Sequence, residues 1–169
     1  WQGVTSQDID TLIEEGKKNF AEKVHIELDL KKALSGAYIV IESMTEEPKA
    51  KIGMYEAMKD LLDEDTILCT NSSTLLPSMF AEYTGRPEKY CALHFANTIW
   101  KNNTGEVMGH PGTDPEIYEK VVEFASAIGM VPLKLHKEQP GYILNSMLVP
   151  FLSAAQALWA NGVADPETI

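Results

Sequence analysis

Short apolar runs alternate along this chain with longer segments that carry apolar residues at helical spacing. The runs are typical of strands buried in a sheet, and they lie at residues 38–41, 66–69, 90–95 and 130–135. The segments with helical spacing lie at residues 6–22, 47–62 and 114–128. Strands that alternate with helices over short connections predict βαβ units, that is, an α/β fold with a mostly parallel sheet covered by helices on both faces.

Weaker patterns predict a few shorter elements. Residues 24–28 alternate apolar and polar side chains and are expected to form a short strand. Another short strand is expected at residues 106–108. One or two helical turns are expected at residues 30–35, and a short helix at residues 77–83, which starts at a proline.

Residues 141–162 differ from the rest because they contain no charged residue and place apolar groups on every side of a helix. Their length would allow a membrane span. Polar residues such as Asn145, Gln156 and Asn161 are spread along the segment, however, and no basic flank would orient it. A helix that is apolar all round is also typical of a buried or interface helix, which is the interpretation we favour.

The composition is that of a folded globular chain, and it excludes some partners. Of the 169 residues, 44% are hydrophobic and 23% are charged, which provides enough apolar material for a sizeable core. The net charge of −11 argues against binding nucleic acid through the overall field, since that binding neutralises phosphates. Two cysteines cannot form a disulfide scaffold, and no basic-then-apolar leader opens the sequence, so a cytoplasmic location is expected.

The two ends of the sequence indicate a piece of a longer protein. The first residue is Trp1 rather than Met, and the last residues include Asp165-Pro166-Glu167. That combination is typical of a helix start, because Asp caps, Pro pre-sets φ and Glu favours the positive end of the helix dipole. We therefore expect the chain to stop within a new helix; a processed small domain with frayed ends is the alternative.

Three predicted strands end in, or are followed by, polar clusters at Glu42–Glu47, Thr70–Thr74 and His94–Asn97. If the strands are parallel, all three clusters lie at the same edge of the sheet, which is where α/β proteins bind ligands. An imidazole, a carboxylate and neutral Ser and Asn donors are the groups that general acid–base catalysis needs. Taken singly, each cluster could instead be an ordinary turn or helix cap, and His94 could be a core residue.

Other candidate sites are weaker. His25, His110 and His136 have no metal-ligand spacing with one another or with the cysteines, so no metal site is predicted. Cys69 and Cys91 lie in apolar runs and are expected to pack as small hydrophobic residues. The sequence contains neither a Gly-x-Gly-x-x-Gly motif nor a Walker loop, so the usual glycine turn for a dinucleotide pyrophosphate is missing.

Four segments stand out as a set. They read Ile39-Val40-Ile41-Glu42-Ser43-Met44-Thr45-Glu46, Asn71-Ser72-Ser73-Thr74-Leu75, Leu93-His94-Phe95-Ala96-Asn97 and Gln139-Pro140-Gly141-Tyr142-Ile143-Leu144-Asn145. In order and spacing they resemble motifs of the 3-hydroxyacyl-CoA dehydrogenase family, V-I-E-x-x-x-E, N-T-S-S-L, H-F-F-N-P and P-G-F-x-x-N-R. The resemblance covers most of residues 33–169 and is specific as a combination.

The resemblance implies an incomplete Rossmann-like NAD-binding domain over residues 1–137 and the start of an all-α helical domain over residues 138–169. It also implies NAD as cofactor, an acyl-CoA substrate, a role in fatty acid metabolism and a homodimer in the full-length protein. The glycine fingerprint and most of the helical domain, which in the family forms the dimer, are absent from this sequence. The fragment alone is therefore expected to bind NAD poorly and to be inactive.

The resemblance also assigns roles to residues. His94 matches the base that takes the hydroxyl proton as hydride leaves the substrate, and Glu106, twelve residues later, matches the carboxylate that orients it (106 − 94 = 12). Ser73 matches the serine that hydrogen-bonds the reacting oxygen, and Asn145 matches the asparagine that holds the substrate near the histidine. The positions that match the nicotinamide side of the cofactor site are Glu46, Lys51 and Asn97.

The substrate side departs from the family pattern. Residues 96–103 replace the usual proline-containing stretch, and Ser146 replaces the usual arginine. Two alternatives therefore stay open. One is a dehydrogenase of a small 3-hydroxy acid that is not a CoA ester, and the other is a catalytically silent α/β interaction domain that associates through the long apolar helix.

Overall fold

The computed structural model describes residues 6–169, and the side chains of residues 11 and 13–169. The chain divides into two compact units, one ending at Ala33 and the other spanning Leu34–Ile169. In the first unit, α1 (Ser6–Lys23) confirms the helix expected at residues 6–22. The turns expected at residues 30–35 form α2 (Leu30–Leu34).

The strand predicted at residues 24–28 is wrong. These residues form neither helix nor strand, and Ile26 and Leu28 are 87% and 94% exposed. An alternating segment becomes a strand only when a neighbouring strand supplies the ladder hydrogen bonds. Within the described part of the chain, the sheet contains no strand that pairs with this segment.

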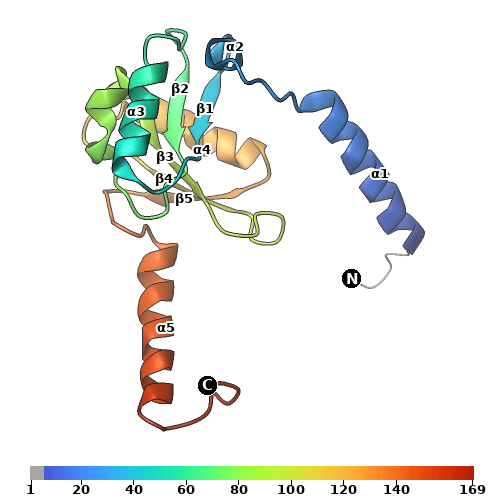
Figure 1. Cartoon of the computed structure of the whole chain (residues 1–169), viewed down its shortest axis with the longest axis vertical. Coiled ribbons are helices and arrows are strands. Elements are labelled where there is room, and N and C mark those ends of the chain that lie inside the picture. Colours follow the sequence, from blue (N-terminus) through green and yellow to red (C-terminus); the bar gives the residue numbers. More distant parts are fainter. Residues whose placement is uncertain (1–5) are drawn as a thin grey trace. The chain divides into compact units, whose positions relative to one another are not determined.

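The second unit is built on a five-stranded sheet in the order β1-β2-β3-β4-β5 (Figure 1). The strands are β1 (Ile39–Glu42), β2 (Ile67–Thr70), β3 (Tyr90–Phe95), β4 (Thr104–Met108) and β5 (Val131–Leu135). β1, β2 and β3 are parallel, β4 is antiparallel to β3, and β5 is parallel to β4. The mostly parallel sheet is thus confirmed, with one reversal that the sequence patterns did not predict.

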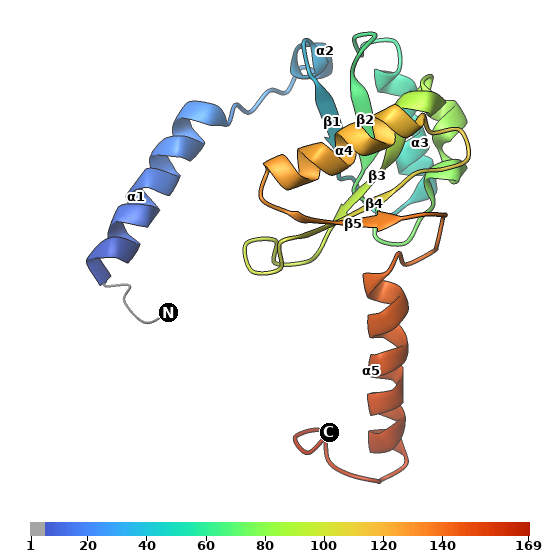
Figure 2. The same cartoon turned by 180° about the vertical axis from the view of Figure 1, so that it is seen from behind.

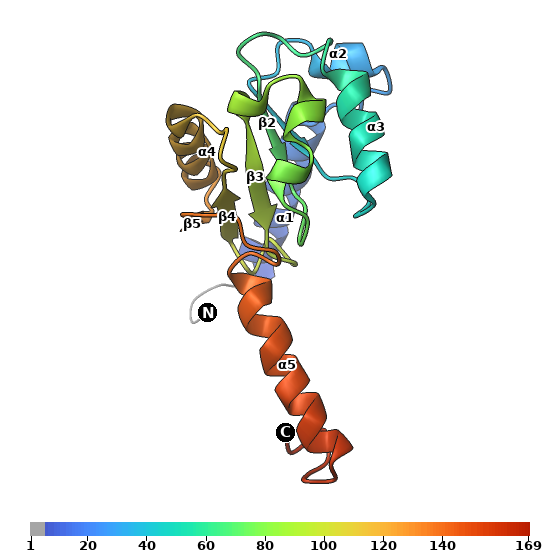
Figure 3. The ribbon, with the colours of Figure 1, turned by 90° about the vertical axis from the view of Figure 1, so that its left-hand side faces the viewer.

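Helices cover both faces of the sheet, as Figures 2 and 3 show. α4 (Pro115–Ala127) packs on one face, where Val121 and Ala125 join Cys69, Cys91 and Val107 in a buried core. The two cysteines are free thiols in that core, as expected. The other face carries α3 (Pro48–Met58) and, in place of one short helix, the 3-10 turns η1 (Pro77–Met79), η2 (Ala81–Thr84) and η3 (Pro87–Lys89).

α4 is the helix that its sequence signals describe most fully. The Asp114 carboxylate accepts a hydrogen bond from the backbone N–H of Glu116 at 2.7 Å and caps the first turn. Pro115 occupies the first helical position, where a missing N–H costs nothing. Gly129 follows the helix with a φ of 84°, the left-handed conformation that glycine adopts freely.

α5 (Leu144–Ala160) is the long apolar helix, and it leads away from the sheet (Figure 1). The interpretation as a buried helix is wrong for this chain, because none of the residues Leu144–Ala160 is buried and Phe151 is 71% exposed. Apolar residues favour burial, but burial also needs a second element to pack on them. Among residues 6–169 no helix is long and apolar enough to cross a membrane. An interface role for α5, and the domain boundary at residues 137–138, stay predictions.

Candidate active site

The carboxyl ends of β1, β2 and β3 lie at one edge of the sheet, because these three strands are parallel. The polar clusters that begin at Glu42, Thr70 and His94 therefore meet at this edge, as predicted. β4 runs the opposite way and begins at the same edge, and its register sets Glu106 directly opposite His94. The single antiparallel pairing is what brings residue 106 to the site.

His94 and Glu106 form a buried hydrogen-bonded pair. Nδ1 of His94 lies 2.8 Å from Oε2 of Glu106, and Glu106 is fully buried whereas His94 keeps 6% of its surface exposed. The second carboxylate oxygen, Oε1, accepts hydrogen bonds from the backbone N–H groups of Ile143 and Leu144 at 2.8 and 2.9 Å. Burying a carboxylate is costly unless its oxygens are paired, and both oxygens of Glu106 are paired here.

The turn that leads into α5 supplies those two N–H groups. Gly141 and Tyr142 both have left-handed backbone, with φ values of 77° and 55°. At the start of a helix the N–H groups lack intrahelical partners and carry a partial positive charge, which favours a carboxylate. Asn145, in the first turn of α5, donates from Nδ2 to the backbone carbonyl of Ser73 at 3.2 Å. Hydrogen bonds therefore link the start of α5 to Glu106 in β4 and to Ser73 in the loop after β2.

His94 lines a cavity of about 550 Å³, a size usual for small-molecule sites. The cavity brings together four of the residues selected from the sequence, namely Ser73, His94, Asn97 and Asn145, with Ala96, Asn102, Asn103, Thr104, Leu144 and Leu148 around them. Because Nδ1 of His94 is bonded to Glu106, Nε2 is the ring nitrogen left for a ligand. No hydrogen bond within residues 6–169 occupies it. The remaining three selected residues, Glu46, Lys51 and Glu106, do not line the cavity.

The loop between β3 and β4 forms the polar rim of this cavity. Nδ2 of Asn102 donates to the backbone carbonyl of Asn97 at 2.7 Å. Thr98 has a φ of 61°, and its carbonyl accepts the N–H groups of Lys101 and Asn102. These bonds fold the loop into a compact turn that carries the amide side chains of Asn97, Asn102 and Asn103 at the cavity.

Glu46 holds the loop after β2 in place. Its Oε1 accepts hydrogen bonds from the Ser72 hydroxyl at 2.6 Å, from the Ser73 N–H at 2.7 Å and from the Thr74 N–H at 3.1 Å. Burial opposes ionisation of Glu46, but these bonds and the charge of Lys51 outweigh it and lower the pKa of the carboxyl below its ordinary value of 4.5. The ionised carboxylate fixes the backbone of Ser73, which lines the cavity.

Lys51 belongs to a buried cluster of side chains that pair with one another next to the site. The side chain is fully buried, and its Nζ lies 2.8 Å from Oε1 of Glu42 and 3.4 Å from Oε2 of Glu46. Glu42 also accepts hydrogen bonds from the hydroxyls of Tyr55 at 2.7 Å and Thr70 at 2.8 Å. Burial raises the pKa of Glu42, but Lys51 and the other donors outweigh it, so the net pKa lies below 4.5. Lys51 reaches the site through Glu46.

The sequence patterns did not predict the partners of Lys51 or the backbone donors to Glu106. They also did not predict that the ring of Tyr142 packs against the imidazole of His94, with the ring centroids 5.0 Å apart. One signal was available. Lys51 stands in the apolar stripe of α3, four residues before Tyr55, which predicts a buried amine in need of a carboxylate. Nothing in the sequence indicates that Ile143 and Leu144 donate to Glu106, because backbone donors have no side-chain signature.

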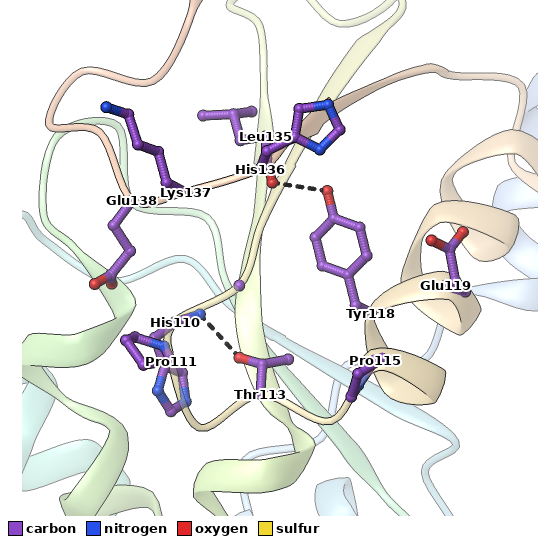
Figure 4. Close-up of a pocket in the computed structure, with 11 residues that line it drawn as sticks. His110, Pro111, Thr113, Pro115, Tyr118, Glu119, Leu135, His136, Lys137 and Glu138 are labelled. Atoms are coloured by element: carbon purple, nitrogen blue, oxygen red, sulfur yellow. Dashed lines mark hydrogen bonds between the residues drawn. The ribbon is translucent and has the colours of Figure 1, made fainter.

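A second cavity, of about 470 Å³, lies at the carboxyl ends of β4 and β5 (Figure 4). Both ring nitrogens of His110 are hydrogen-bonded to backbone groups. The Tyr118 hydroxyl donates to the carbonyl of Leu135 at 3.0 Å, and burial raises the pKa of this phenol to about 12. These hydrogen bonds occupy the ring nitrogens of His110 and the hydroxyl proton of Tyr118, so none of these is left for a ligand. Among the residues described, no group of three or more His, Cys, Asp or Glu side chains could hold a metal.

The residues at the sheet edge fit the nicotinamide half of a dinucleotide. A carboxamide is uncharged and needs neutral donors and acceptors, and Asn97, which lines the cavity together with Ser73, can supply both. The ionised Glu46 lies beside them and is 38% exposed in its side chain. For the pyrophosphate half, the 169 residues contain no Gly-x-Gly-x-x-Gly turn. The residues present could therefore hold the nicotinamide half of such a cofactor.

A mostly parallel sheet with helices on both faces and a polar site at the carboxyl ends of its strands defines the Rossmann-like class of nucleotide-binding domains. Within that class, residues 3–139 match the family described as 3-hydroxyacyl-CoA dehydrogenase, NAD binding domain. The chain belongs to this family, and NAD is the cofactor of the domain.

Two relatives and one solved structure illustrate the similarity. The chain is 33% identical over 131 residues to 3-hydroxybutyryl-CoA dehydrogenase of Clostridioides difficile, covering 78% of this chain and 46% of the relative. It is also 33% identical over 131 residues to the mitochondrial hydroxyacyl-coenzyme A dehydrogenase of Homo sapiens, covering 78% and 41%. A diketoreductase structure, described as showing substrate-directed dual catalysis of dicarbonyl compounds, superposes with a TM-score of 0.84 at 45% identity, over 98% of this chain and 65% of that one. The chain thus spans less than half the length of the first two relatives.

Proposed function

We propose that the full-length protein interconverts a 3-hydroxyacyl-CoA and the 3-ketoacyl-CoA with NAD, and that His94 is its general base. The observation that carries the proposal is the buried pair in which Nδ1 of His94 is bonded to Glu106 at 2.8 Å while the same ring lines a cavity. A histidine held in this way has one defined nitrogen, Nε2, free to accept the proton of a substrate hydroxyl.

The reaction in this direction is a two-electron oxidation of the C3 alcohol of the substrate to a ketone. NAD, when bound, accepts the hydride from C3 of the substrate. The C3 hydroxyl loses its proton to Nε2 of His94, and the electron pair of the O–H bond becomes the second bond of the ketone. Glu106 stabilises the imidazolium that forms, and the N–H groups of Ile143 and Leu144 keep its carboxylate in place. In the reverse direction the imidazolium returns the proton to the carbonyl oxygen.

The other selected residues position the substrate and the cofactor. Ser73 hydrogen-bonds the reacting oxygen, and no hydrogen bond within residues 6–169 uses its hydroxyl. Asn145 holds the substrate beside His94, and its own bond to the Ser73 carbonyl supports that placement. Glu46 and Asn97 face the nicotinamide half of the cofactor, and Lys51 supports Glu46 from beneath. A homodimer, a cytoplasmic location and a role in fatty acid metabolism belong to the same proposal.

A small substrate that is not a CoA ester is the second candidate. Two observations favour it: the amide-rich rim formed by Asn97, Asn102 and Asn103, and the 45% identity to a diketoreductase. Asparagine side chains suit carboxylate or carbonyl oxygens of a small polar substrate. The reaction would be the same, with the hydroxyl proton passing to His94.

The test uses the full-length protein with NADH and two substrates, acetoacetyl-CoA and a small free 3-keto acid. We expect His94→Ala to lower kcat on the preferred substrate at least about a hundredfold, the low end for loss of a general base. His136→Ala, at an exposed histidine, is the matched control and should leave kcat unchanged. Near-normal turnover by His94→Ala would overturn the site assignment. If the wild-type protein shows no NADH-linked turnover with either substrate, the silent interaction domain becomes the better interpretation.

A further inference from the structure

Tyr142 is a fully buried residue whose ring lies against the imidazole of His94. The two ring centroids are 5.0 Å apart and the ring planes are inclined by 42°. Centroids within about 4.5–7 Å mark contacting aromatic pairs. The phenol ring therefore covers part of the imidazole, whose Nδ1 is bonded to Glu106.

The backbone next to Tyr142 contacts Glu106, the partner of His94. Tyr142 has a φ of 55°, a left-handed conformation that a residue with a side chain seldom adopts unless its surroundings impose it. The next two residues, Ile143 and Leu144, donate their N–H groups to Glu106. One short turn thus contacts both members of the pair, with a side chain on His94 and with backbone donors on Glu106.

The ring of Tyr142, and not its hydroxyl, makes this contact useful. Within the described chain the hydroxyl is buried without a hydrogen-bond partner. Burial, together with the charges of Glu46 and Glu106, raises the pKa of the phenol well above its ordinary range, so the group stays neutral.

One hydrogen bond does not fix the plane of a histidine ring. The χ2 torsion of histidine is broad, so rotation about it can break the single bond at Nδ1 and carry Nε2 away from the substrate. A proton acceptor works only within about 2.6–3.2 Å of the proton's heavy atom. A rigid ring packed on the imidazole removes this freedom.

We propose that Tyr142 is a positioning residue that holds the imidazole of His94 in the plane that directs Nε2 into the cavity. The inference rests on the proposed function of His94. It assigns no proton transfer to Tyr142, whose contribution is the packing of its ring.

The test compares Tyr142→Phe, which keeps the ring, with Tyr142→Leu, which removes it, in the full-length protein. We expect Tyr142→Phe to keep kcat within about twofold and Tyr142→Leu to lower it about ten- to hundredfold, as for a misplaced catalytic group, with KM nearly unchanged. Tyr142→Phe should also melt no lower than wild type, because it removes a buried hydroxyl that has no partner. Tyr142→Met fills the space with a flexible chain and replaces Tyr142→Leu if that variant does not fold.

A readout that needs no turnover separates this inference from the proposed function. In the NMR spectrum of the full-length protein, the Nδ1 proton signal of the His94 hydrogen bond to Glu106 should be sharp in wild type and Tyr142→Phe. It should broaden or disappear in Tyr142→Leu. The inference is overturned if Tyr142→Leu keeps both the signal and kcat, or if Tyr142→Phe loses as much kcat as Tyr142→Leu. An inactive wild-type protein with the expected signals would sink the proposed function alone.

Discussion

Two buried ionic clusters lie at the same edge of the sheet, and they differ in whether an atom is left for a ligand. In the α3 cluster, formed by Glu42, Lys51 and Tyr55, the buried groups bond to one another and to Thr70 and Glu46. In the His94–Glu106 pair, the carboxylate is satisfied on both oxygens but one nitrogen of the imidazole is not.

An atom left without a partner distinguishes a cluster that can bind a ligand from one that only stabilises the fold. Burying charge is costly in both places, and both clusters offset that cost with close partners. Only the His94–Glu106 pair borders a cavity with an unused donor or acceptor. Perturbed pKa values alone would have pointed to the α3 cluster, since the pKa of Glu42 is lowered by its partners. An open atom beside a cavity is the better sign of chemistry.

The largest expected effect is on stability, at the α3 cluster. Lys51→Met in the full-length protein should lower the free energy of unfolding by about 3–5 kcal/mol, because it leaves the buried carboxylate of Glu42 without its cation. Lys49→Met, at an exposed lysine of the same helix, is the control and should change it by less than about 0.5 kcal/mol. Urea unfolding measures both. Equal losses in the two variants would mean that the cluster does not stabilise the fold.

The second largest effect is on the turnover number, kcat, when the His94–Glu106 pair is changed. Glu106→Gln should lower kcat about a hundredfold or more, equivalent to about 2.7 kcal/mol, because the neutral amide no longer stabilises a charged imidazole. Glu123→Gln, at an exposed glutamate of α4, is the control. NADH-linked kinetics of the full-length protein measure the change. An unchanged kcat in Glu106→Gln would remove the distinction between the two clusters.

The smallest effect is on the free energy of unfolding at acid pH. The pKa values of Glu42 and Glu46 are lowered in the folded protein, so their contribution to stability is complete above the ordinary value of 4.5 and is lost as the pH falls through the lowered values. Wild-type protein should therefore lose unfolding free energy more steeply below pH 4.5 than Glu42→Gln, which has one such carboxylate fewer. Urea titrations at a series of acid pH values give the two slopes. Parallel slopes would show that Glu42 titrates alike in the folded and unfolded chain.

Some of the fold and site could be predicted from local patterns. The apolar runs gave the sheet strands, and the Asp114-Pro115 start and Gly129 end bounded α4. The strand expected at residues 24–28 failed because alternation describes one half of a ladder and says nothing about the partner. The buried helix failed for the same reason, since apolar residues at 144–160 need a second element to bury them.

The sequence alone was enough to select candidate site residues and to locate the strands at whose ends they lie. Composition and periodicity are local properties of a sequence. The buried strand at residues 90–95 and the histidine within it can therefore be recognised from the sequence alone. Only the tertiary structure decided that β4 reverses direction, that Glu106 takes its N–H donors from the start of α5, and that Tyr142 packs on His94. These contacts join residues distant along the chain through backbone groups and ring faces, which leave no pattern in the sequence.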